Sequence, residues 1–189
     1  MYAKVENNVI VKANSSLASF NRAAPSWSAE QLAANGIYEV VYDNSNLKDY
    51  RFYNNGAESF TFANDTVTAS YTAAVGKTLD DVNATDEDGV ELDPVVVISG
   101  VKSIEKNQIK AQAASLLQST DWYVVRNAES STAIPANVST FRTAVRTKSN
   151  EMETAIDGAA SVEAVEALFT YTTGADDVVS RPLGEWPKL

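Results

Sequence analysis

The first 75 residues carry short apolar runs that alternate with polar positions, a pattern typical of β-strands. Turn-forming asparagines separate these runs. Strands are predicted for five of them: residues 9–11, 37–42, 50–53, 59–63 and 67–74. Asn7 and Asn8 predict a hairpin between Val5 and Val9, and Asn54-Asn55-Gly56 predicts a second hairpin between residues 50–53 and 59–63. We therefore expect a β-rich N-terminal domain over residues 1–75.

Two short helices are predicted among these strands. One falls near Ser16–Arg22, before Pro25 interrupts the pattern. The other begins after Ser28, which serves with Gln31 as a capping box, and ends at Gly36, which suits a left-handed stop.

Residues 76–100 lack a helical period and are rich in acidic side chains. Asp88-Gly89 predicts a turn, and residues 95–99 predict a strand that returns to the N-terminal sheet. We expect this segment to be an acidic, solvated connector.

From Val101 the spacing of apolar residues becomes helical, which predicts a helical domain over residues 101–170. Within residues 101–118, Ile109 and Ala113 lie four apart, and a further helix is entered at Asp121. The next helix has Pro135 in its first turn, ends at Gly158 and is followed by a helix that Ser161 caps. The apolar face of the helix that ends at Gly158 is formed by residues three, four or seven apart: Val138, Phe141, Val145 and Met152.

The last segment, residues 171–189, contains two prolines and is predicted to be an extended tail. Trp186 lies in it, and a tryptophan in an extended segment is expected to be covered. Either the chain's own domain or a partner chain provides that cover. Strands followed by helices make the predicted fold class α+β, with a β-rich N-terminal part, a helical C-terminal hairpin or bundle and an extended tail.

Composition removes much of the usual catalytic chemistry. The 189 residues include no histidine and no cysteine, so a Ser-His-Asp triad, a thiolate nucleophile and a Cys/His zinc site are all excluded. We expect no enzymatic activity and no cofactor. A net charge of −10 disfavours nucleic-acid binding, and the longest strongly apolar run, residues 95–98, is too short to cross a membrane.

The acidity is concentrated in one segment. Residues 76–100 hold one basic and seven acidic side chains, whereas residues 1–75 and 101–189 each have a net charge of −2. Nearly neutral flanking parts suit protein–protein contact. Within the segment, Asp81, Asn83 and Thr85 have the spacing of a calcium loop, but Asp86 and Leu92 replace the glycine and glutamate that such a loop requires. The sequence therefore predicts a plain acidic loop and no metal site.

Residues 114–146 contain an order of residues found in a known family. Leu116-Leu117 precede Thr120-Asp121-Trp122, and Pro135, Phe141-Arg142 and Val145-Arg146 follow. This order resembles the C-terminal module of the phage tail (fibre) assembly chaperone family, in which a tyrosine stands at the place of Phe141. The N-terminus also resembles short phage tail-region proteins: Met1-Tyr2, Val5–Asn8, Ser16–Ala18 and Gly36–Val40. Residues 76–100 and those after Thr170 lie outside the pattern.

The resemblance implies partner-binding residues within this segment, which are Trp122, Tyr123, Arg126, Arg142 and Arg146. Trp186 is a further candidate that lies outside the pattern, because an exposed tryptophan in the extended tail favours docking on a partner. Trp122 and Tyr123 are large apolar anchors with one polar group each. Arg142 and Arg146 share a helix face, and Asp121 and Glu129 are candidates to pair with them. Two interpretations stay open: a helical hairpin with Trp122 as its core plug, and a groove that grips another tail protein.

The leading functional hypothesis is a non-enzymatic structural or adaptor protein of a phage tail, in the baseplate, tail tip or tail-fibre attachment. The resemblance implies a multi-chain assembly with other tail or tail-fibre proteins, located in the virion tail after synthesis in the host cytoplasm. A transient tail-fibre assembly chaperone is the alternative. A third hypothesis is a glycan or small-ligand module that uses aromatic residues of the sheet: Tyr38, Tyr42, Tyr50, Phe52 and Tyr53.

Overall fold

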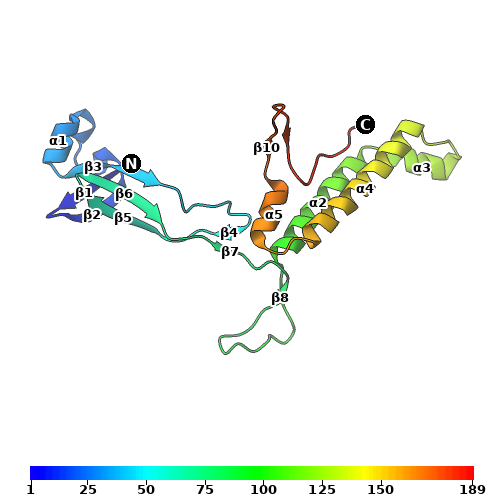
Figure 1. Ribbon diagram of the computed structural model, residues 1–189, viewed down its shortest axis with the longest axis horizontal. Coiled ribbons are helices and arrows are strands. Elements are labelled where there is room, and N and C mark those ends of the chain that lie inside the picture. Colours follow the sequence, from blue (N-terminus) through cyan, green and yellow to red (C-terminus); the bar gives the residue numbers. More distant parts are fainter. The chain divides into compact units, whose positions relative to one another are not determined.

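The computed structural model describes residues 1–189, and the chain divides into two compact units, Met1–Val75 and Gly76–Leu189 (Figure 1). The first unit is built on strands and the second on helices. With 37% of residues in helices and 24% in strands, the predicted α+β class is confirmed.

The first unit is a five-stranded sheet that curls into a half-barrel, with the strand order β2-β1-β3-β6-β5. Its strands are β1 (Tyr2–Glu6), β2 (Val9–Ser15), β3 (Ile37–Asp43), β5 (Glu58–Ala63) and β6 (Thr66–Tyr71). Neighbouring strands are antiparallel except β3 and β6, which are parallel with Val40 opposite Val67. The amide of Asn14 on β2 donates to Glu58 on β5 at 2.9 Å, which links the two edges.

The core of this unit lies on one face of the sheet, where short side chains alternate with exposed ones. Its buried members are Ala3, Val5, Val40, Val67 and Ala69. The partly buried rings of Tyr38 and Phe62 pack against it, with centroids 4.8 Å apart.

The turns explain one correct and one wrong prediction. Asn7 and Asn8, with φ of 52° and 63°, form the predicted β1–β2 turn. The second hairpin is not at Asn54-Asn55-Gly56: β5 pairs with β6 through Asn64 and Asp65, whose φ values of 50° and 56° fit a tight turn. The side chain of Asn55 instead bonds the backbone of Lys48 in both directions at 2.9 Å, and the short strand β4 (Tyr53–Asn54) pairs with β7 (Val75–Gly76).

The helices of the first unit are short. α1 (Ala29–Ala34) has the predicted capping box between Ser28 and Gln31, and Gly36 has φ of 65° as expected. The helix predicted near Ser16–Arg22 is wrong as an α-helix. Only two 3₁₀ turns form there and beyond, η1 (Leu17–Ser19) and η2 (Ala24–Ser26).

The second unit is dominated by four helices: α2 (Val101–Gln118), α3 (Asp121–Ser130), α4 (Ala136–Asp157) and α5 (Val162–Phe169). Pro135 precedes α4, Gly158 follows it, and the Ser161 hydroxyl accepts from the Ala164 amide to cap α5. The predicted apolar face of α4 is confirmed, because all four of its predicted members are buried: Val138, Phe141, Val145 and Met152. α2 and α4 lie side by side along their lengths (Figure 1).

The C-terminal segment packs back on these helices. It starts with a small hairpin, β10 (Thr172–Thr173) and β11 (Val179–Ser180), so only its last part is extended. Leu183 is buried with Ile109 and Met152, and Trp186 packs against the same core. The Trp186 indole also donates to Gln112 on α2 at 2.8 Å. The sequence did not decide whether Trp186 is covered by its own chain or by a partner, and the structure shows that its own chain covers it.

Residues 80–99 form a projecting ribbon, called the arm below. In it β8 (Val82–Asn83) pairs antiparallel with β9 (Val97–Ile98), so the strand expected to return to the N-terminal sheet pairs inside the acidic segment instead. That expectation was wrong because a partner strand lies only about 15 residues away along the same segment, which costs less loop-closure entropy. None of the helices is long and apolar enough to span a membrane.

Candidate protein-binding site

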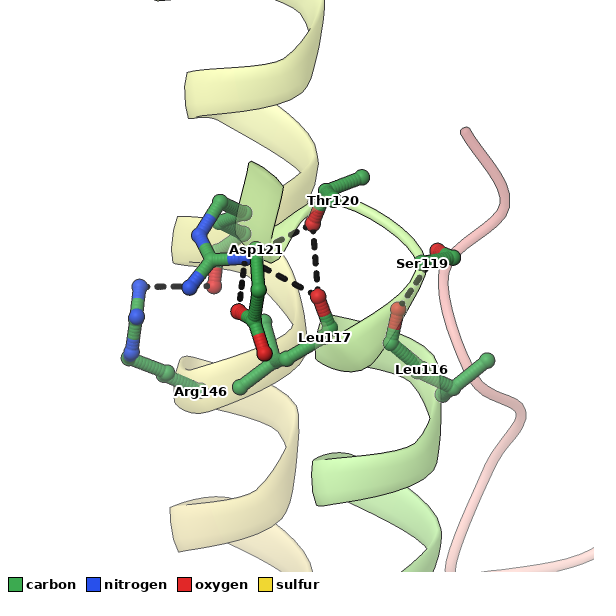
Figure 2. Close-up of polar contacts among 7 residues, drawn as sticks. Leu116, Leu117, Ser119, Thr120, Asp121 and Arg146 are labelled. Carbon is green, nitrogen blue, oxygen red and sulfur yellow. Dashed lines mark hydrogen bonds and ion pairs between the residues drawn. The ribbon is translucent and has the colours of Figure 1, made fainter. Parts of the chain in front are cut away.

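The junction between α2 and α3 is a tight turn held by its own hydroxyl groups. Ser119 Oγ donates to the carbonyl of Leu116 at 3.0 Å, and Thr120 Oγ1 donates to that of Leu117 at 2.8 Å (Figure 2). These bonds add hydroxyl donors to carbonyls in the last turn of α2, where the regular helical donors run out. α3 therefore begins at Asp121 in a direction fixed by the turn.

Arg142 on α4 fastens α4 to this junction. Its Nη1 donates to the Leu117 carbonyl at 2.9 Å, to Thr120 Oγ1 at 2.7 Å and to Asp121 Oδ1 at 2.8 Å (Figure 2). Its side chain is only 10% exposed, so the three acceptors compensate a charge taken out of water. The expected pairing of Asp121 with an arginine is present, and this guanidinium is used inside the chain.

Arg146 lies one turn further along α4 and is bound far less firmly. Its Nη1 donates to the backbone carbonyl of Arg142 at 3.4 Å (Figure 2). Glu129, the other predicted acid, pairs with neither arginine. Arg146 therefore keeps a charge that no acid of this chain neutralises.

α3 differs from the other long helices because none of its ten residues is buried. Three of its large side chains lie substantially in water: Trp122 is 52% exposed, Val124 40% and Val125 53%. Trp122 is therefore not the core plug of the hairpin. Phe141 and Val145 fill that place instead.

An aromatic–cation cluster occupies the same helix. The rings of Trp122 and Tyr123 are tilted by 36° with centroids 4.2 Å apart. The Arg126 guanidinium lies 4.5 Å from the Trp122 ring and 5.3 Å from that of Tyr123, within reach of a cation–π interaction. Its Nε is buried without a hydrogen-bond partner. The stacked arginine places a positive charge beside the tryptophan.

The aromatic residues of the first unit do not form one exposed platform. Phe52 and Tyr53 are buried, and Tyr38 packs on the core of the sheet. Only Tyr42 and Tyr50 of that set are exposed, and the Tyr42 hydroxyl donates to Asn14. Stacking of a sugar ring needs accessible ring faces, so these contacts weaken the glycan hypothesis.

Two carboxylates of the segment with calcium-loop spacing are engaged with the backbone. Asp81 Oδ1 accepts from the Gly100 amide at 2.8 Å, and this bond, with one from Ser103, lowers the pKa of Asp81 below its usual value. Asp86 Oδ1 accepts from the amides of Asp88 and Val90. No group of three or more acidic side chains is placed to hold a metal ion.

The second unit also has a shallow groove. It runs between α4 and the C-terminal tail and is lined mainly by small polar and charged side chains, among them Ser139, Thr143, Thr147, Lys148 and Glu185. None of the six sequence-predicted site residues lines it. Those six instead divide into three on α3, two on α4 and Trp186 in the tail.

The chain matches no protein-family model, no curated protein and no solved structure. The resemblance to phage tail assembly chaperones therefore stays a prediction from the residues. Sequence reasoning also missed two exposed parts of the surface, Val125 on α3 and the apolar run Val95–Ile98 of the arm. Both are visible in the sequence as apolar residues, but their exposure is a tertiary property.

Proposed function

We propose that this chain is a non-enzymatic structural or adaptor protein of a bacteriophage tail, which acts through contacts with other tail or tail-fibre proteins. The resemblance of residues 114–146 to phage tail assembly chaperones suggests the setting. One structural observation carries the mode of action: α3 exposes Trp122, Val124 and Val125 on a helix that buries none of its residues. Large apolar side chains left in water on one helix favour a surface that a partner covers.

The residue types on α3 support this role. Tryptophan, tyrosine and arginine are the side chains that most often carry the binding energy of an interface. Trp122, Tyr123 and Arg126 already stack on one another, so little side-chain entropy is lost when a partner arrives. Arg142 and Trp186 act differently, because they hold α4 and the tail and so fix the base on which α3 stands.

The non-enzymatic part of the proposal rests on the sequence, which supplies neither imidazole nor thiol. The proposed location is the virion tail, in the baseplate, tail tip or tail-fibre attachment, after synthesis in the host cytoplasm. The contacts are between proteins, and the proposal includes no cofactor and no nucleic acid.

Quantitative mass spectrometry of purified virions tests the proposal. We expect the chain in every preparation at a fixed ratio to the other tail proteins. Detection only in lysates of infected cells would contradict a structural role and favour the transient assembly chaperone instead.

A variant on α3 tests the mode of action. Trp122→Ala should lower incorporation of the chain into particles, whereas Tyr50→Ala, which removes another exposed aromatic ring from the first unit, should not. If both variants enter particles as the natural chain does, α3 is not the docking helix.

A further inference from the structure

The arm leaves apolar side chains in water on both of its faces. Val95, Val96, Val97 and Ile98 follow one another along the chain and are each between 49% and 57% exposed. Val97 and Ile98 are successive residues of β9 and so point to opposite faces, which means that neither face of the ribbon is packed on a core there. Val90, near the tip, is exposed as well. A surface of this kind is typical of a segment that is enclosed in an assembly.

The arm is nevertheless a hydrogen-bonded ribbon. Its strands pair Val82 with Ile98 and Asn83 with Val97, and the Ala84 amide donates to the Val96 carbonyl at 2.7 Å. The bond from the Gly100 amide to Asp81 ties its base to the start of α2. A two-stranded ribbon without a core is only marginally stable in water, so docking on another surface would add most of its stability.

Charge indicates the kind of surface that would cover the arm. Residues 80–99 contain seven acidic side chains and no basic one, and of these acids only Asp80 forms an ion pair, with Lys102 at 3.2 Å. The complementary surface needs positive charge beside apolar groups.

The α3 end of the second unit has that combination. Residues 119–151 contain four basic and three acidic side chains, a net charge of +1. Arg142 is paired with Asp121 and Lys148 with Glu151, whereas Arg126 and Arg146 have no acidic partner. Arg126 lies on the Trp122 ring. Exposed apolar side chains and two uncompensated guanidinium groups thus belong to the same end of the helical hairpin.

The two complementary surfaces lie at opposite ends of α2. β9 ends three residues before α2 begins at Val101, and α3 begins three residues after α2 ends at Gln118. An α-helix of 18 residues is about 27 Å long. In Figure 1 the arm leaves one end of the α2–α4 pair and α3 closes the other. The arm therefore faces away from the α3 of its own chain.

We propose that the arm of one copy docks on the α3 surface of a second copy of this chain, in a head-to-tail arrangement. Apolar arm residues would pack on Trp122 and Val125, and arm carboxylates would bind Arg126 and Arg146, whose guanidinium groups suit carboxylates. An arrangement that joins two different surfaces repeats from copy to copy and builds a ring or a filament. The inference rests on the α3 interface of the proposed function and names one occupant for it.

Sedimentation velocity on the purified full-length chain tests this arrangement with two variants. Val96→Asp damages the arm and keeps α3, whereas Arg126→Glu damages α3 and keeps the arm. The natural chain should associate as its concentration rises, and each variant alone should associate at least about tenfold more weakly. A mixture of the two variants should form a one-to-one dimer, because one intact arm then meets one intact α3 surface.

Three results would overturn the proposal: a natural chain that stays monomeric up to about 1 mM, variants that associate as the natural chain does, and a mixture that associates no better than its components. Val125→Asp repeats the α3 test if Arg126→Glu fails to fold, and Lys12→Glu in the first unit is the matched charge-reversal control. Circular dichroism checks the fold of each. Virion mass spectrometry is a separate readout, so loss of the phage assignment and loss of head-to-tail association are distinguishable.

Discussion

α4 and α3 are neighbouring helices of one unit that share an amphipathic pattern but differ completely in burial. α4 buries seven of its 22 residues, whereas α3 buries none of its ten. The apolar face of α4 meets α2 and α5, while Trp122 and Val125 of α3 meet water. The comparison teaches that apolar periodicity indicates a face to be covered without saying which molecule covers it.

The two helices also use arginine in opposite ways. Arg142 on α4 is buried and donates to three oxygens of its own chain. Arg126 on α3 lies on aromatic rings, has no acidic partner and keeps an unbonded Nε. Arg142 therefore stabilises the fold, whereas Arg126 presents a positive charge on α3.

The largest expected loss of stability follows from replacing Arg142. Arg142→Met should lower the free energy of unfolding by about 2–4 kcal/mol, because it removes three hydrogen bonds and leaves the buried Thr120 hydroxyl without its donor. Arg146→Met is the matched control and should change it by less than about 1 kcal/mol, since its one bond is 3.4 Å long. Urea unfolding measures both, and equal effects would remove the distinction between the two arginines.

A smaller loss of stability is expected when the tail is released from the helices. Trp186→Ala removes the packing of the indole on the core around Ile109 and Phe141 together with its bond to Gln112. The free energy of unfolding should fall by about 1–3 kcal/mol, and Gln112→Ala should account for less than about 1 kcal/mol of it. An unchanged melting temperature for Trp186→Ala would mean that the tail is not packed on its own chain.

On α3 we expect a substitution to affect docking strongly and the stability of the fold only weakly. Trp122→Ala should change the free energy of unfolding by less than about 1 kcal/mol, because the side chain lies half in water. The same change should strongly weaken docking, measured as association in sedimentation velocity. A loss of stability as large as that of Arg142→Met would show that Trp122 supports the fold.

The smallest effect concerns pH and the base of the arm. The Gly100 amide favours the ionised form of Asp81 and lowers its pKa in the folded chain. This contribution to stability is present above the unfolded pKa of about 3.9 and is lost as the pH falls through the folded pKa. Urea unfolding at several pH values below that point should show a slightly smaller acid-induced loss for Asp81→Ala than for the natural chain. An identical loss in both chains would mean that the Gly100 bond does not persist in solution.

Most of the regular structure followed from local signals. The capping box at Ser28, the Asn7-Asn8 turn and the apolar face of α4 are each decided by neighbouring residues, and all are present. The hairpin predicted at Asn54-Asn55-Gly56 failed because the Asn55 side chain binds the backbone of Lys48 instead. Turn propensity alone did not reveal this competition, because the backbone that captures Asn55 lies seven residues away in the loop before β4.

The candidate site was predictable as a set of residues but not as an arrangement. The sequence singled out Trp122, Arg126 and Arg142 together. Only the fold separates them, because the distance from Arg142 to Thr120 and Asp121 depends on how α2 and α4 pack. The exposure of the arm could not be predicted for the same reason, since residues 95–98 predict a strand equally well whether that strand is buried or exposed.

The most direct test of the account is hydroxyl-radical footprinting of Trp122, read by mass spectrometry in the free chain and in assembled particles. Trp186, packed on its own helices, serves as the internal reference. The account predicts that Trp122 is strongly oxidised in the dilute free chain and protected in the particle, while Trp186 changes little. Equal oxidation of Trp122 in both states would contradict the claim that α3 is a docking surface.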